Sequence, residues 1–107
     1  MAQSQSAALT VRHEWDGGVA VVTVAGEIDM TSVGALSDVL GDLVRKDPER
    51  VIIDIAAVGF LDSSAIHAFV QTRHELSGEC SVVLRAPQPQ ARRMFELTGL
   101  DSLCLVE

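Results

Sequence analysis

The sequence of 107 residues is poor in aromatic and basic side chains. Aromatic residues make up 4% of the chain, which is too few for an aromatic-rich binding surface. The 8 Lys and Arg residues are outnumbered by 15 Asp and Glu residues, and the formal net charge is −7. Binding to DNA or RNA depends on basic side chains that release counterions from phosphates. The composition therefore argues against a nucleic acid as a direct partner.

The sequence also lacks segments that direct a protein to a membrane. Residues 1–8, MAQSQSAA, have neither the basic start nor the apolar stretch of a signal peptide. The longest apolar run is interrupted by Asp54, well short of a membrane-spanning length. We therefore expect a cytoplasmic protein with no membrane partner. Residues 1–8 are expected to be a flexible N-terminal tail, followed by one domain at residues 9–107.

Cysteine is scarce, and the sequence shows no motif for a metal or cofactor. Cys80 and Cys104 each lie in an apolar segment, so in a non-secreted chain we expect two reduced core thiols. No Cys-x-x-Cys or His-x-x-x-His spacing supports a zinc site. The glycines match neither a Walker loop nor a dinucleotide fingerprint. We expect no metal and no cofactor.

The chain does contain enough apolar residues, 48%, for one domain with a hydrophobic core. Residues 9–14 alternate between apolar and polar side chains, which predicts a strand with one face in water. Gly17 and Gly18 follow, as a tight hairpin turn requires, and residues 19–25 are apolar throughout. These segments predict an antiparallel hairpin.

The rest of the chain alternates helical and strand patterns. Thr31 or Ser32 is expected to cap a helix that ends before Asp47-Pro48. The β-branched block Val51–Ile55 predicts a strand covered on both faces. The remaining predicted elements are a helix from about residue 63 to Gly78, a strand at Cys80–Leu84, a helix opened by Pro87-Gln-Pro-Gln90 and stopped by Gly99, and a strand at Leu103–Val106.

This order of elements predicts the α/β class. Strands that alternate with helices are joined by crossover connections, which give mostly parallel sheets. We expect a single domain with a mixed, mostly parallel sheet of about four to five strands and an N-terminal β-hairpin. About three helices should pack mainly on one face of this sheet, because their apolar residues form one-sided stripes.

The junction Asp62-Ser63-Ser64 stands between the central strand and the following helix. Asp and Ser are favoured before a helix because their oxygens accept the first free N–H groups. A serine hydrolase is the enzymatic alternative, since His67 lies four residues after Ser63. However, Leu61 and Ala65 occupy the places where a nucleophile elbow has glycines. We expect no enzyme.

Four blocks in order resemble a STAS domain of the anti-sigma factor antagonist type. They are Gly26-Glu-Ile-Asp29, Val51-Ile-Ile-Asp-Ile55, Phe60-Leu-Asp-Ser-Ser64 and Met94-Phe-Glu-Leu-Thr-Gly-Leu100. The resemblance extends from about Leu9 to Val106. It implies that the chain binds an anti-sigma factor with serine kinase activity and thereby releases a sigma factor. It further implies that the kinase inactivates the chain by phosphorylating Ser63, and a serine phosphatase becomes a candidate partner.

The resemblance also implies a partner-binding surface around the phosphorylation site. Its candidate residues are Asp29, Met30, Thr31, Asp62, Ser63, Ser64 and Ala65. Ala65 departs from the family pattern, which has glycine there. A methyl group on a surface pressed against a kinase would hinder close approach. We therefore expect Ala65 to weaken recognition by the kinase and to leave the fold unaffected.

Two other functions stay open at this point. The first is a STAS subunit without a switch that scaffolds a larger complex, such as a stress-signalling assembly or a lipid-transport apparatus. The second, more remote, is the small serine hydrolase. An antagonist needs an accessible acceptor serine and a kinase, a scaffold needs neither, and a hydrolase needs a base and oxyanion donors.

Overall fold

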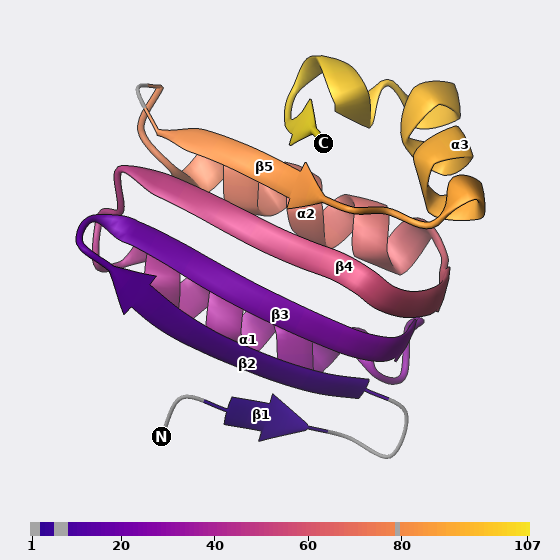
Figure 1. Ribbon diagram of the computed structural model, residues 1–107, viewed down its shortest axis with the longest axis horizontal. Coiled ribbons are helices and arrows are strands. Elements are labelled where there is room, and N and C mark those ends of the chain that lie inside the picture. Colours follow the sequence, from indigo (N-terminus) through magenta and orange to yellow (C-terminus); the bar gives the residue numbers. More distant parts are fainter. Residues whose placement is uncertain (1–2, 6–8, 79) are drawn as a thin grey trace.

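The computed structural model describes residues 3–5, 9–78 and 80–107, which form one α/β domain (Figure 1). Its sheet has the strand order β1-β2-β3-β4-β5-β6. The elements in chain order are β1 (Gln3–Gln5), β2 (Leu9–Asp16), β3 (Val19–Ile28), α1 (Val33–Val44), β4 (Arg50–Leu61), α2 (Ser63–Glu75), β5 (Ser81–Arg85), α3 (Pro89–Thr98), the 3-10 turn η1 (Leu100–Ser102) and β6 (Leu105–Val106).

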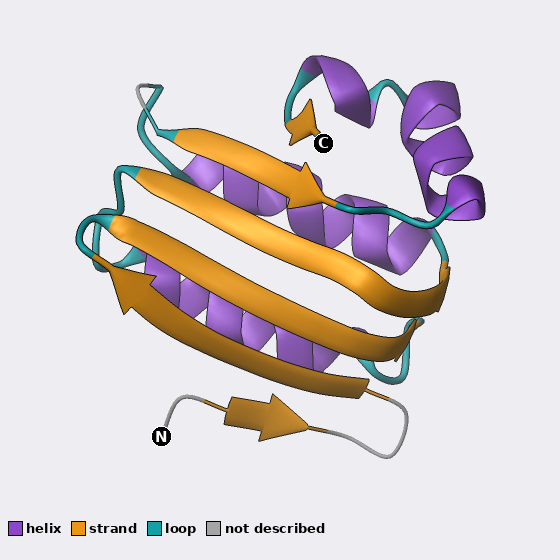
Figure 2. Cartoon of the chain, in the orientation of Figure 1, coloured by secondary structure: helices purple, strands orange, loops and turns teal. Residues whose placement is uncertain are grey.

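The predicted fold class is confirmed. Strands β1, β2 and β3 pair antiparallel, and β3, β4, β5 and β6 pair parallel. Helices α1 and α2 lie side by side on one face of the sheet, and α3 lies beyond the end of β5 (Figure 2). The sheet has one strand more than predicted, because the short strand β1 extends one edge. The strand predicted at Leu103–Val106 is present as β6 and forms the other edge.

The N-terminal hairpin forms where the glycine pair predicts it. Asp16 pairs with Val19, so Gly17 and Gly18 make a two-residue turn. Gly17 has a φ of 61°, which residues other than glycine rarely adopt. Upstream of the hairpin, Gln3–Gln5 pairs with β2, whereas a flexible tail was predicted at residues 1–8. The rest of that prediction lies outside the described residues.

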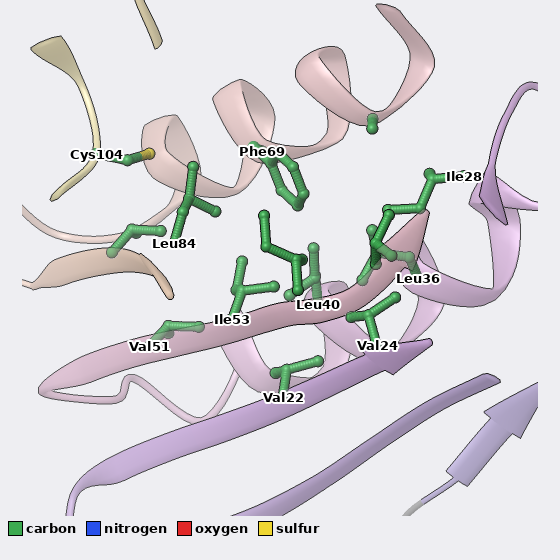
Figure 3. Packing of buried hydrophobic residues seen from close by; sticks show 14 of the residues in the cluster. Val22, Val24, Ile28, Leu36, Leu40, Val51, Ile53, Phe69, Leu84 and Cys104 are labelled. Carbon is green, nitrogen blue, oxygen red and sulfur yellow. The ribbon is translucent and has the colours of Figure 1, made fainter. Parts of the chain in front are cut away.

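The core lies between the sheet and the helices (Figure 3). Val51, Ile53 and Ile55 of β4 are fully buried and face this core. Ile52, between them, is only partly buried and points to the other face, which no helix among the described elements covers. The prediction of a strand covered on both faces is therefore wrong. The strand also continues beyond Ile55, to Leu61.

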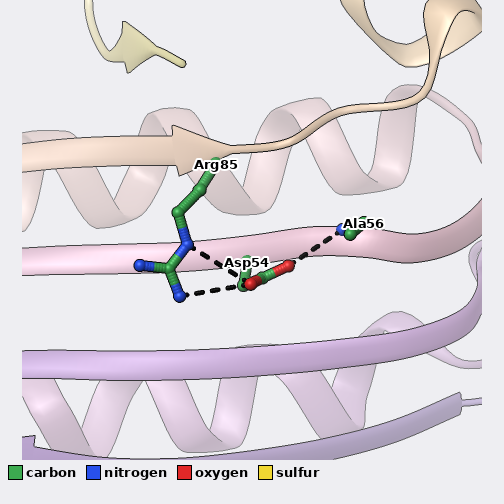
Figure 4. Close-up of polar contacts among 3 residues, drawn as sticks. All are labelled: Asp54, Ala56 and Arg85. Atoms are coloured by element: carbon green, nitrogen blue, oxygen red, sulfur yellow. Dashed lines mark hydrogen bonds and ion pairs between the residues drawn. The ribbon is translucent and has the colours of Figure 1, made fainter.

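Beyond Asp54, strand β4 loses β5 as a partner, because the last residue pair of the two strands is Asp54 with Arg85. Side chains replace the missing strand there. Arg85 donates to the Asp54 carboxylate at 3.1 and 3.3 Å, and Asp54 accepts the Ala56 N–H at 3.0 Å (Figure 4). The amide of Gln88 donates to the Ala56 carbonyl at 3.2 Å. The edge of β4 is thus partly closed by side chains rather than by backbone pairing.

The helix ends agree with the sequence in one case and differ in another. Helix α3 stops at Gly99, as predicted, and Gly99 has a φ of 79°. Leu100, directly after it, is buried. Helix α2 ends at Glu75, and extended backbone at Leu76 ends it before Gly78 is reached.

Cys80 and Cys104 are both buried, and burial raises the pKa of the Cys104 thiol to about 11.

Phe69 of α2 and Phe95 of α3 connect the two helices through the core. Both side chains are fully buried, and their rings meet edge to face with centroids 6.2 Å apart. We expect Phe95→Ala to lower the free energy of unfolding by about 3–5 kcal/mol, because it removes a buried ring and leaves a cavity.

Urea denaturation measures this effect, and Leu97→Ala is the matched control. Leu97 lies on the same helix and is 79% exposed, so its truncation should change the free energy by less than about 0.5 kcal/mol. An equal effect of both substitutions would show that the contact between α2 and α3 does not stabilise the fold.

Candidate functional site

Two acidic junctions, in which Asp29 or Asp62 follows the end of a strand and precedes a helix, lie next to each other. Ile28 ends β3, Leu61 ends β4, and these two residues are paired in the sheet. The N–H of Asp62 donates to the Ile28 carbonyl at 3.2 Å. Asp29 and Asp62 therefore follow adjacent parallel strands at their carboxyl ends, where open α/β sheets present ligand sites.

Asp62 caps helix α2, as its residue type predicts. Its backbone is extended, and its carboxylate accepts the N–H of Ser64 at 2.8 Å. The cap begins the helix at Ser63, which is exposed. Among the described residues, the Ser63 hydroxyl has no hydrogen-bond partner. The structure thus presents this hydroxyl to solvent on the first turn of a helix.

The two residues after Ser63 turn away from solvent. Ser64 is partly buried, and Ala65 is fully buried within the hydrophobic core. The methyl group of Ala65 therefore does not lie on the surface, and the expected hindrance to a kinase is wrong. For the same reason, the side chain of Ala65 cannot contact a partner, although the sequence placed it among the partner-binding candidates.

Asp29 organises the loop between β3 and α1. Its carboxylate accepts the Thr31 hydroxyl at 2.7 Å, the Thr31 N–H at 2.9 Å and the Ser32 N–H at 3.0 Å. These bonds favour the charged form, and the Thr31 hydroxyl, the largest cause, holds the pKa of Asp29 below its ordinary value. Ser32 precedes α1 but its hydroxyl donates to the Glu27 carbonyl, so neither Thr31 nor Ser32 makes the side-chain cap that was expected. The Asp29 carboxylate instead accepts the N–H groups of the turn that leads into α1.

Two large apolar side chains are exposed on the segments that carry the acidic junctions. Met30 is 78% exposed in the loop after β3, and Phe60 is 47% exposed two residues before Asp62. Met30 was among the predicted site residues, and Phe60 was not. Exposed large apolar side chains near polar residues are typical of surfaces that bind other proteins.

The hydrolase alternative gains no support from the geometry. His67 is exposed on α2, and no hydrogen bond between it and Ser63 occurs within the described part of the chain.

No group of three or more His, Cys, Asp or Glu side chains that could hold a metal ion occurs among residues 3–5, 9–78 and 80–107. None of the helices that these residues form is long and apolar enough to cross a membrane.

Comparison with known proteins supports the resemblance seen in the sequence. The profile of the STAS domain matches residues 11–106. The chain belongs to the STAS domain family. The anti-sigma-F factor antagonist RsfB of Mycobacterium tuberculosis is 32% identical to it over 93 residues, which cover 87% of this chain and 76% of RsfB.

Solved structures of other proteins have the same fold over most of this chain. An anti-sigma factor antagonist from Mycobacterium paratuberculosis superposes with a TM-score of 0.83 at 36% identity, covering 96% of this chain and 89% of that protein. The Bacillus cell fate determinant SpoIIAA in its phosphorylated form superposes with a TM-score of 0.71 at 20% identity, covering 91% and 90%. The second likeness supports the fold alone.

The hydrogen bond from Thr31 to Asp29 leads to a prediction about pH. We expect Thr31→Val, which removes only the hydroxyl, to raise the pKa of Asp29 toward its ordinary value. The stabilisation from this bond should be complete above the unfolded pKa of Asp, about 3.9, and be lost as pH falls through the lower folded pKa.

An NMR pH titration of the Asp29 carboxyl carbon checks this prediction. Thr98→Val is the control, because the Thr98 hydroxyl donates to the Met94 carbonyl on α3 and should leave Asp29 unchanged. An unchanged Asp29 titration in Thr31→Val would contradict the assigned cause.

Proposed function

We propose that this STAS domain is an anti-sigma factor antagonist that is controlled by phosphorylation of Ser63. In the unphosphorylated state it binds an anti-sigma factor in the cytoplasm and so releases a sigma factor. The anti-sigma factor is also the serine kinase, and a serine phosphatase restores the active form. The chain is the substrate of this kinase and has no catalytic role of its own.

The observation that carries this proposal is the exposure of the Ser63 hydroxyl directly after Asp62, at the end of β4. Ser63 follows Asp62, and the N–H of Asp62 donates to the carbonyl of Ile28, the last residue of β3. Asp29 comes directly after Ile28. Met30 and Phe60 supply apolar contact area on the same two segments. The name of RsfB and that of the M. paratuberculosis protein, both anti-sigma factor antagonists, support the same function.

Phosphorylation at this position acts on an interface more than on the fold. A phosphate adds roughly −1.5 to −2 charge at neutral pH. The N-terminus of α2 partly compensates this charge within the domain, while Asp62 and Asp29 add to it at the surface. SpoIIAA has this fold in both its unphosphorylated and its phosphorylated form, with TM-scores of 0.77 and 0.71 to this chain. We therefore infer electrostatic rejection of the partner without a change of fold.

The acceptor is expected to be Ser63 and not another hydroxyl near the site. Ser64 is partly buried, Ser32 is 2% exposed, and the hydroxyl of Thr31 is bonded to Asp29. Fragmentation mass spectrometry after incubation with the kinase and ATP checks this prediction. A phosphate on Ser64 with Ser63 unmodified would overturn the assignment, and Ser63→Ala should abolish the modification.

Substitution of Ser63 should separate binding from stability. We expect Ser63→Ala to bind the anti-sigma factor as wild type does, and Ser63→Asp to bind at least about tenfold more weakly. The free energy of unfolding of both variants should lie within about 1 kcal/mol of the wild-type value. Ser63→Ala loses only an exposed hydroxyl, and the carboxylate of Ser63→Asp is favourable at a helix N-terminus. Calorimetric titration and thermal melts measure the two quantities.

Ser77→Asp is the matched control for charge. Ser77 is exposed just beyond the other end of α2, so the variant carries the same added charge away from the proposed interface. It should bind as wild type does, and the defect of Ser63→Asp should shrink as salt is raised. If Ser63→Asp binds at low salt as tightly as Ser77→Asp, the switch is wrong and a scaffold without a switch takes its place.

A further inference from the structure

A small cavity with mostly apolar lining lies at the end of β4, in the segment that precedes Asp62 and Ser63. Its volume is about 130 Å³. Strand β4 and helix α3 form its walls, and the residues that line it are Val58, Phe60, Leu61, Gln90, Ala91 and Met94. None of these side chains is charged. Phe60 is about half exposed and Met94 partly buried, so the cavity opens to the surface.

The cavity exists because β4 continues past the end of β5. Helix α3 covers this edge instead of a neighbouring strand, and a helix packs less closely against a strand edge than a paired strand does. The amide of Gln90 donates to the Gly59 carbonyl and so satisfies one backbone acceptor of the free edge. Most of the cavity's lining residues are apolar.

The size and lining of the cavity select one kind of occupant. An apolar protein cavity of about 150 Å³ can hold benzene, so about 130 Å³ suits a single aliphatic or aromatic side chain. A charged group would lose its hydration there and find no partner of opposite charge among the lining residues. An uncharged apolar side chain is therefore the favoured occupant.

The position of the cavity indicates where that side chain comes from. Phe60 and Leu61 directly precede Asp62-Ser63, so the wall of the cavity runs into the phosphorylation site. Two residues of the cavity wall thus belong to the segment that leads directly into the acceptor serine. Interfaces of this kind place a few apolar anchors in pockets next to polar contacts.

We propose that the cavity between β4 and α3 receives one apolar side chain of the anti-sigma factor and anchors it on this domain. This inference rests on the proposed function and adds α3 to the surface expected from the sequence. The anchor supplies affinity, and Ser63 controls whether the two surfaces can approach.

Met94→Glu tests the anchor, with Leu97→Glu as the matched control. Both substitutions put a carboxylate on α3 in place of an apolar side chain, but Leu97 is 79% exposed and does not line the cavity. We expect Met94→Glu to weaken binding to the purified anti-sigma factor at least about tenfold and Leu97→Glu to change it less than about twofold. Phe60→Ala, at a half-exposed position, is a second variant that should weaken binding without unfolding the domain.

The outcomes distinguish the cavity from the switch. If wild type binds the anti-sigma factor and Ser63→Asp does not, the proposed function holds. Equal loss in Met94→Glu and Leu97→Glu, or wild-type affinity in both Met94→Glu and Phe60→Ala, then overturns the anchor alone. Loss of a homodimer in Met94→Glu, seen by light scattering, with unchanged binding of the anti-sigma factor would also overturn it. Failure of wild type to bind would overturn both proposals.

Discussion

The parallel pairing of β3 with β4 is the contact on which the site depends. These strands connect α1 and α2 to the same sheet, and their last residues, Ile28 and Leu61, are fully or nearly fully buried side by side. Because both strands end at the same edge, the loops that follow them are neighbours in space although they are 33 residues apart in sequence. The bond from Asp62 to the Ile28 carbonyl then joins the two loops directly.

A rigid junction suits a switch that acts by charge. The Asp29 carboxylate bonds two N–H groups and a hydroxyl, and Asp62 bonds the first turn of α2. Both carboxylates are therefore held near their positions before any partner arrives, so little conformational freedom is lost on binding. A phosphate on Ser63 would add to a negative surface that is already fixed, and the energetic consequence would fall on the interface.

The sequence predicts the elements and the acidic junctions well, because these depend on local patterns. The glycine pair specifies the hairpin, and Asp62 specifies the start of α2. It does not predict which residues of β4 beyond Ile55 face the core. Irregular pairing with β3 moves the register there, so Val58 and Leu61 are buried three apart while Phe60 is exposed. Simple alternation fails at such a bulge, which is why Phe60 was not among the predicted site residues. Ala65 is a separate case, because it lies on the face of α2 that packs into the core.

The same irregularity connects the fold to the proposed interface. Without the extra residues in β4, strict alternation from Ile55 would place Ala57 and Gly59 toward the core and Val58 and Phe60 on the opposite face. With them, Val58 packs inside, Phe60 stands at the rim of a cavity, and the strand still ends beside Ile28. An exposed apolar ring lowers the solubility of the isolated domain more than it lowers its stability. Its placement two residues before Asp62 puts apolar attraction and charge control within one short segment of the chain.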